Sequence, residues 1–128
     1  MRSNIELNTA RVFVRDIESA KKFYSGKLGL AIEADGSQYG YCVFKVGNTD
    51  LAVGTVADEA PEEERVMVGR FTGLSFSVQD VEAKHRELAA SGVPITGVPA
   101  EQQRGGILET LQEPAGYELQ IVQHHTAA

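Results

Sequence analysis

Histidine, cysteine and carboxylate side chains are the groups with which this chain could bind a metal ion or transfer a proton. The sequence has three histidines, His85, His124 and His125, and one cysteine, Cys42. His85 stands among charged residues, as on the solvent face of a helix, while His124 and His125 stand in a stretch expected to be a frayed tail. A single cysteine excludes a disulfide or thiolate cluster within one chain, so we interpret Cys42 as a small core residue. These residues predict adventitious metal binding at most.

Two glutamates are candidates for acid–base or ligand chemistry. Glu109 is expected on a buried strand, where a carboxylate must meet a donor such as Arg11 or Arg104, or face a wet pocket. One hypothesis is metal-free catalysis, with Glu109 or Glu118 as general base and a tyrosine as acid. No carboxylate pair and no nucleophile with an adjacent base accompanies them, so the catalytic residues stay unknown.

Length and composition exclude several classes of function. The 128 residues, 42% of them hydrophobic, suit one domain with one core. Lys and Arg number 12 against 18 Asp and Glu, so the net charge is -6, which argues against nucleic acid as a partner. No apolar run approaches the roughly 20 residues of a membrane-spanning helix, and no signal-peptide stretch follows the first charge. We therefore expect a cytoplasmic protein without a membrane or nucleic-acid partner.

The sequence contains an internal repeat. Residues 12–18, VFVRDIE, are echoed by residues 76–82, FSVQDVE. Both segments alternate apolar and polar residues up to an aspartate, which predicts a half-buried strand leading into a helix N-cap at Asp16 and at Asp80. Apolar residues at helical spacing follow both aspartates. Glycines that can end these helices are Gly26, Gly29 and Gly92.

More strands are expected after each helix. The strand-forming segments, separated by glycine- or proline-containing turns, are about 31–34, 39–46 and 50–56, then 94–98, 106–112 and 117–123. Each half therefore has the order strand, helix, strand, strand, strand. The acidic stretch at about 57–69 has no core face, and we interpret it as a solvated linker.

Four pieces of the sequence resemble the vicinal oxygen chelate superfamily. They are residues 14–16, VRD, residues 23–24, FY, residues 28–30, LGL, and residues 113–119, EPAGYEL. The last of these looks like the family's D-P-D-G-Y-x-x-E ending. This superfamily includes glyoxalase I, bleomycin-resistance proteins, methylmalonyl-CoA epimerase and extradiol dioxygenases. The pieces occur in the family's order over nearly the whole chain.

The resemblance implies an α+β fold in which two βαβββ modules form a cupped, eight-stranded mixed sheet around a small-molecule ligand. Residues 1–128 then make one domain of the glyoxalase/bleomycin-resistance type. Module one would span about 5–56, the linker about 57–69 and module two about 70–124. Such modules pair within one chain or are exchanged between two chains, and a homodimer is the expected assembly.

The resemblance also locates the positions of metal ligands. Metal-dependent members place His, Gln or Glu on four strands, and the matching positions here are Thr9, Ala52, Gly73 and Gln120. Only Gln120 could donate an oxygen, and a neutral amide is a weak ligand for a divalent cation. We therefore expect no metal site and no cofactor. Asp50, two positions from Ala52 on the same strand face, would alter this expectation if the strand had another register.

Strand alternation predicts which side chains face the cup. If Val12 and Val14 pack under the first helix, and Leu119 and Ile121 lie in the core, their neighbours face the ligand. The predicted ligand-binding cup consists of Thr9, Arg11, Phe13, Asp50, Ala52, Gly73, Ser75, Ser77, Glu109, Glu118 and Gln120.

The sequence does not predict which face of the sheet three aromatic residues of the first half occupy. Tyr39, Tyr41 and Phe44 either stack on a planar or cationic ligand or fill ordinary sheet positions. The alternation does not decide between these, because aromatic and apolar residues occupy both faces of the segment.

The leading hypothesis is a small-molecule-binding protein that sequesters an antibiotic-like or metabolite ligand without transforming it. Acidic residues such as Asp50, Glu109 and Glu118 would suit a cationic ligand. The alternative is a metal-dependent lyase, isomerase or dioxygenase, similar to glyoxalase I, which would need a divalent metal and rests on fold analogy.

Overall fold

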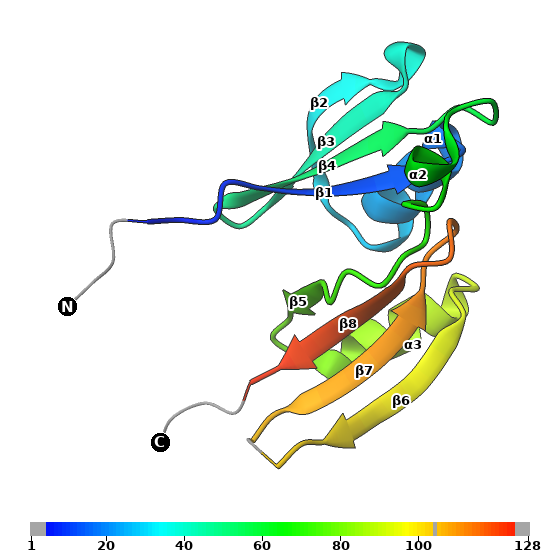
Figure 1. Cartoon of the computed structure of the whole chain (residues 1–128). Coiled ribbons are helices and arrows are strands. Elements are labelled where there is room, and N and C mark those ends of the chain that lie inside the picture. Colours follow the sequence, from blue (N-terminus) through cyan, green and yellow to red (C-terminus); the bar gives the residue numbers. More distant parts are fainter. Residues whose placement is uncertain (1–4, 104, 125–128) are drawn as a thin grey trace. The chain divides into compact units, whose positions relative to one another are not determined.

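The computed structural model describes residues 5–103 and 105–124, which form two compact units (Figure 1). The first unit ends at Gly69 and the second begins at Arg70. Each unit contains a four-stranded mixed sheet and one longer helical segment. The α+β class and the two βαβββ modules predicted from the sequence are thereby confirmed. None of the helices in the described ranges has the length and apolar character needed to cross a membrane.

The first unit is ordered as the repeat predicts. Its elements are β1 (Thr9–Val14), α1 (Ile17–Lys21), a π-helical turn (Lys22–Lys27), β2 (Ala31–Gly36), a 3-10 turn (Ser37–Tyr39), β3 (Tyr41–Val46), β4 (Thr49–Thr55) and α2 (Glu62–Arg65). The strand order is β1-β4-β3-β2, with β1 parallel to β4 and the other pairs antiparallel. The α1 helix packs on β3 and β4.

The second unit repeats this plan. Its elements are β5 (Ser75–Ser77), α3 (Val81–Ala90), β6 (Ile95–Glu101), β7 (Ile107–Gln112) and β8 (Glu118–Gln123). The strand order is β5-β8-β7-β6, with β5 parallel to β8 and the remaining pairs antiparallel. The α3 helix packs on β6, β7 and β8. In each sheet the first strand of the unit is therefore an edge strand beside the last one.

The helix N-caps lie where the sequence predicts them. One carboxylate oxygen of Asp16 accepts hydrogen bonds from the amides of Glu18 and Ser19, and Asp80 accepts one from the amide of Ala83. These bonds satisfy amides that the first turn of a helix leaves unpaired. The first helical segment continues through the π-helical turn and ends before Gly29, whose φ of 85° suits a residue without a side chain.

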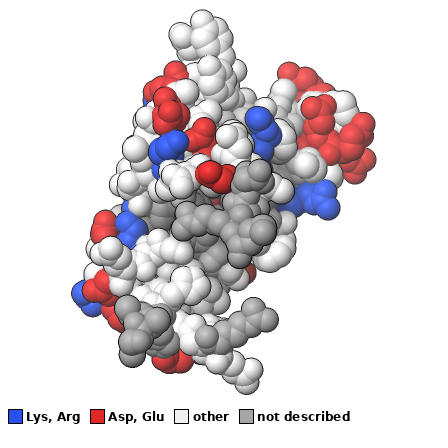
Figure 2. All heavy atoms as spheres, turned by 90° about the vertical axis from the view of Figure 1, so that its left-hand side faces the viewer, with Lys and Arg blue, Asp and Glu red and all other residues white. Residues whose placement is uncertain are grey.

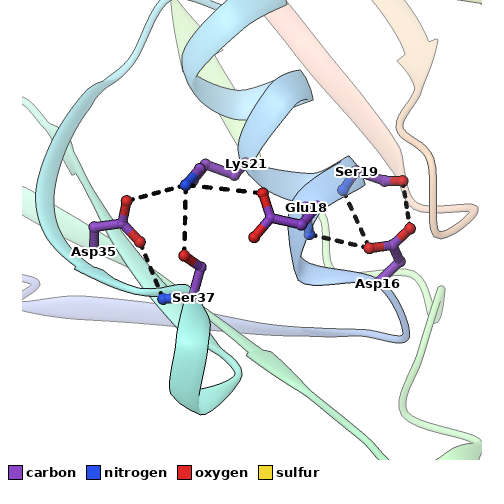
Figure 3. Close-up of polar contacts among 6 residues, drawn as sticks. All are labelled: Asp16, Glu18, Ser19, Lys21, Asp35 and Ser37. Carbon is purple, nitrogen blue, oxygen red and sulfur yellow. Dashed lines mark hydrogen bonds and ion pairs between the residues drawn. The ribbon is translucent and has the colours of Figure 1, made fainter.

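Polar contacts attach α1 to β2 (Figure 3). Nζ of Lys21 lies 3.0 Å from Oδ2 of Asp35 and 3.9 Å from a carboxylate oxygen of Glu18. Hydrogen bonds from Ser37, with a further one from Lys21, lower the pKa of Asp35 to about 2, and the Asp35 contact raises the pKa of Lys21. The network fixes the helix to the strand at the surface of the first unit.

Each unit has its own apolar core on the helix side of its sheet. In the first unit the rings of Phe23 and Tyr24 meet edge to face at 5.0 Å, and Tyr24 also contacts Phe44. Cys42 is buried there, as expected of a core residue, and this burial raises the pKa of its thiol. The second core includes the fully buried Leu88, Leu111, Tyr117, Leu119 and Ile121.

The connection between the sheets, expected to be a solvated linker, contains the short helix α2. Its residues are exposed, and Arg65 donates a hydrogen bond from Nε to the carbonyl of Ala60 at 2.9 Å. The acidic run therefore forms a solvated turn of helix, stabilised locally, and contributes no side chain to the described apolar core.

Candidate ligand-binding site

The first sheet presents the predicted side chains on its face away from α1. Val12 and Val14 of β1 are buried, and Thr9, Arg11 and Phe13 alternate with them. Thr9 pairs with Asp50 and Arg11 pairs with Ala52 across β1 and β4. Asp50 lies 3.6 Å from Nζ of Lys45, so the one carboxylate on this part of the face already has a cationic partner.

The second sheet shows the same alternation. Leu119 and Ile121 of β8 are buried, while Glu118 is exposed and Gln120 half-buried. Ser75 pairs with Gln120 and Ser77 with Val122. Gly73 precedes β5 and has a φ of 71°. Among the predicted cup residues, the structure thus places Ser75, Ser77 and Gln120 side by side.

The strand registers establish which residues of the two units are equivalent. The sequence repeat aligns Arg11 with Ser75, and their strand partners are Ala52 and Gln120. Ala52 and not Asp50 is therefore the first unit's counterpart of Gln120. Asp50 lies two residues away, opposite Thr9.

A pocket of about 600 Å³ lies within the second unit, beside β7 and β8. Gln120, a predicted site residue, is part of its lining together with Gln102, Gln103, Gly105, Gly106, Leu108, Val122 and His124. This volume is in the range of pockets that hold drug-sized molecules. Through Gln120, this pocket includes one residue of the predicted cup.

Sequence reasoning missed most of this lining. The turn between β6 and β7 supplies Gln102, Gly105 and Gly106, and no sequence motif predicts the path of that turn. His124, expected in a frayed tail, lines the pocket instead, while His125 lies outside the described residues. Val122 could be expected in the lining, since alternation from the buried Ile121 predicts that Val122 faces the ligand side.

Glu109 corrects the predicted cup. It lies on the core face of β7 with Leu111, where its carboxylate is 0% exposed, and Oε2 is hydrogen-bonded to Nδ1 of His85 on α3. The expectation that His85 faces solvent is corrected by the same contact. Of the partners expected for Glu109, Arg11 belongs to the other unit and Arg104 lies outside the described residues; the structure supplies His85 instead.

The remaining polar and aromatic candidates do not line the pocket of the second unit. Glu118 is exposed, and Oε2 accepts a hydrogen bond from Thr96 at 3.1 Å. Tyr39 and Tyr41 are exposed, whereas Phe44 is fully buried in the first core. Phe44 therefore fills an ordinary sheet position, and the two tyrosines lie at the surface of the first unit.

The face drawn in Figure 2 shows how the charges are distributed. Acidic side chains gather in several clusters, while basic side chains stand singly, several of them directly beside acidic ones. On that face the described residues form no broad basic patch of the kind that binds a phosphate backbone.

Family comparison identifies the fold. The model of the Glyoxalase/Bleomycin resistance protein/Dioxygenase superfamily matches residues 6–121. The chain belongs to this superfamily. The match covers both βαβββ modules, in agreement with the resemblance seen in the sequence. No curated protein sequence matches the chain.

Solved structures of superfamily members share the fold. TnmS3, an antibiotic binding protein from Streptomyces sp. CB03234, is similar with a TM-score of 0.78 and 22% identity, covering 98% of this chain and 100% of that one. A Glyoxalase/bleomycin resistance protein/dioxygenase superfamily member from Sphaerobacter thermophilus DSM 20745 has a TM-score of 0.76 and 22% identity, covering 94% and 98%. At this identity the likeness shows the fold alone.

The residues at the four positions where the resemblance puts metal ligands do not form a donor set that fits a divalent cation. Thr9 offers a neutral hydroxyl, Ala52 and Gly73 offer no side-chain donor, and Gln120 offers one amide oxygen. Hard divalent cations need several oxygen ligands, usually including carboxylates. Within residues 5–103 and 105–124, no three His, Cys, Asp or Glu side chains come together as a metal-binding group.

Proposed function

We propose that this superfamily member binds a small organic molecule and does not carry out the metal-dependent chemistry of its catalytic relatives. The observation that carries the proposal is the equivalence of Ala52 and Gln120 in the two sheets. With Thr9 and Gly73 at the other two positions, one amide would have to hold the cation, and enolate or peroxide chemistry requires a metal that stays bound.

Two further observations support binding. The pocket beside β7 and β8 has a volume of about 600 Å³, which suits a drug-sized ligand. TnmS3, which shares the fold, is an antibiotic binding protein. We extend to this chain the idea of sequestration, in which an antibiotic-like or metabolite ligand is held without being changed.

The proposed setting is the cytoplasm, with the protein acting as a homodimer. The basis for the dimer is the resemblance to the superfamily, whose modules pair within one chain or are exchanged between the two chains of a dimer. Sedimentation velocity at micromolar concentration is expected to show twice the mass of a 13.8 kDa chain. A single species of monomer mass over the whole concentration range would overturn the dimer.

The metal content of protein purified without an affinity tag tests the central proposal. Elemental analysis is expected to find no stoichiometric nickel, zinc, manganese or iron, and addition of each ion is expected to leave the melting temperature unchanged. A ligand incubated with the protein should be recovered chemically unchanged.

The matched variants are Asp50→Asn and Gln120→Leu. Asp50 has a buried oxygen, Oδ1, without a hydrogen bond, and it lies two residues from Ala52 on β4. A stoichiometric metal that disappears in Asp50→Asn would overturn the proposal and favour the lyase, isomerase or dioxygenase alternative. Both variants are expected to contain no stoichiometric metal, like the unchanged protein.

A further inference from the structure

The floor of the pocket in the second unit is an apolar pair next to an amide. Leu108 and Val122 are directly opposite each other across β7 and β8. Gln120 lies two residues before Val122, at the neighbouring position on the same face of β8. Leu108, Val122 and Gln120 are all half-buried. Cross-strand apolar neighbours of this kind make a flat surface on which one side of a ring system can lie.

The wall of the pocket is a hydrogen-bonded turn. The amide of Gln102 donates to the carbonyl of Gly106 at 2.9 Å, and the amide of Gly105 donates to the carbonyl of Gln102 at 2.9 Å. Nε2 of Gln102 donates to the carbonyl of Ala100 at 3.0 Å, which fixes this side-chain amide beside the turn. These main-chain bonds hold Gln102, Gly105 and Gly106 together at the edge of the pocket.

Amides, glycines and aliphatic side chains make up the described lining, together with the ring of His124. Three side-chain amides, from Gln102, Gln103 and Gln120, are combined with two glycines and two aliphatic residues, and no Asp, Glu, Lys or Arg is among the described lining residues. Among the described lining residues a charged ligand would meet no Asp, Glu, Lys or Arg as a fixed counter-charge. The carboxylates expected to favour a cation lie elsewhere: Glu109 is on the core face and Glu118 bonds Thr96.

Gln120 has free capacity for hydrogen bonding. Its main-chain amide bonds the carbonyl of Leu74, whereas its side-chain amide makes no hydrogen bond to the described residues. A carboxamide offers one acceptor and two donor hydrogens in a plane. It therefore complements a ligand edge that carries a carbonyl next to an N–H or O–H group.

We propose that this pocket takes an uncharged, flat organic molecule, with one ring face on Leu108 and Val122 and a carbonyl-bearing edge on the side-chain amide of Gln120. The inference rests on the proposed function, because it names the ligand class of the same site. It replaces the cationic ligand that the acidic residues of the sequence favour with a neutral one.

An isosteric series of probes tests the ligand class. 2-Naphthamide, 2-naphthoate and 2-naphthamidinium have nearly the same shape and are neutral, anionic and cationic. Equilibrium dialysis at neutral pH is expected to give a dissociation constant for the carboxamide at least about tenfold lower than for either charged probe. Stronger binding of the carboxylate or the amidinium, or binding of none of the three, would overturn the proposal.

Variants then locate the binding. Gln120→Leu should weaken carboxamide binding by about tenfold, the effect of one lost hydrogen bond, and Leu108→Ala should weaken it as well. Arg86→Ala is the control, because Arg86 is exposed on α3, which packs on the opposite face of the sheet, and is absent from the lining. Equal loss in Arg86→Ala, or no loss in Gln120→Leu, would overturn the assignment to this pocket.

Two more variants keep the test decisive if Gln120→Leu fails to fold. Gln120→Glu keeps the shape and adds a negative charge, so the preference should move from the carboxamide to the amidinium. Arg104 lies outside the described residues but stands between the lining residues Gln103 and Gly105 in the sequence. Arg104→Gln tests whether its positive charge contributes to binding. Carboxylate binding that depends on Arg104 would show an anion pocket and overturn the inference.

The outcomes for ligand class and for function are distinguishable. Neutral selectivity together with a stoichiometric metal, or with chemical change of the ligand, would overturn the proposed function and leave the ligand class standing. A metal-free protein that prefers a charged probe would leave binding standing and overturn the ligand class.

Discussion

His85 on α3 and Glu109 on β7 are hydrogen-bonded between Nδ1 and Oε2, although 24 residues separate them in the chain. Glu109 is completely buried, and 25% of the His85 side chain is exposed. The second carboxylate oxygen, Oε1, has no hydrogen-bond partner among the described residues. The pair therefore holds the helix to the sheet in a way that depends on both side chains.

Removal of His85 is predicted to destabilise the protein strongly. His85→Ala leaves the Glu109 carboxylate buried without a partner, and breaking a buried pair in this way costs about 3 kcal/mol of unfolding free energy. Urea unfolding followed by circular dichroism measures the loss. Arg86→Ala, an exposed neighbour on the same helix, should change the free energy by less than about 0.5 kcal/mol.

A double variant separates loss of the bond from loss of packing. Replacing both side chains, His85→Leu with Glu109→Leu, removes the buried polar group together with its partner and should recover most of the stability. If His85→Ala costs no more than Arg86→Ala, the contact contributes nothing to the fold.

The Asp35 network predicts a specific sensitivity to acid. The pKa of Asp35 is lowered from 3.8 to about 2, so its ionised form stabilises the folded state above pH 3.8, and this contribution is lost as the pH falls towards 2. Asp35→Asn should melt at a lower temperature than the unchanged protein at neutral pH, with the difference shrinking over this window. Thermal melts between neutral pH and pH 2 measure it.

Glu33→Gln is the control for this titration, because Glu33 is exposed on the same strand, β2, and takes no part in the drawn network. A pH dependence of Asp35→Asn no different from that of Glu33→Gln would mean that the contacts of Lys21 and Ser37 do not stabilise the ionised carboxylate.

The N-cap of α3 is predicted to contribute about 1 kcal/mol. Asp80→Ala removes the acceptor for the amide of Ala83, which lies 3.1 Å from Oδ1. Asp80→Ser retains a capping oxygen and should lose less. Unfolding free energies of the three proteins, with hydrogen exchange at the Ala83 amide, provide the measurement; equal losses in both variants would contradict a capping role.

Two glycine substitutions are predicted to have opposite signs. A Cβ on Gly106 would lie 3.0 Å from the carbonyl oxygen of Gln123, and its φ is 121°, so Gly106→Ala should destabilise by about 1–3 kcal/mol. Gly26 lies in the π-helical turn with its nearest contact at 3.9 Å, and Gly26→Ala should stabilise by about 0.5 kcal/mol. Differential scanning calorimetry compares the two, and a stabilised Gly106→Ala would refute the close approach.

Several features of this chain could be predicted because they depend on residues close in sequence. An aspartate after an alternating strand caps a helix through amides two or three residues away, so Asp16 and Asp80 locate both helices. The repeat of this signal predicts two modules of the same plan. Alternation also places Val12, Val14, Leu119 and Ile121 in the cores, because each strand has apolar residues on one face.

The facing of β7 could not be predicted in the same way. Leu108 and Leu111 lie on opposite faces of the strand, so apolar residues mark both faces and alternation gives no unique answer. A buried glutamate next to them is compatible with either face until a partner is known. That partner, His85, comes from a helix distant in the sequence.

Local sequence therefore determined the two capped helix starts, most of the strands and the two-module plan, since each depends on residue type and short-range spacing. Tertiary structure alone decided the register that makes Ala52 the counterpart of Gln120, the burial of Glu109 against His85, and the pocket beside Leu108 and Val122. These depend on which strands, turns and helices meet, and such long-range contacts carry no signal in the spacing of neighbouring residues.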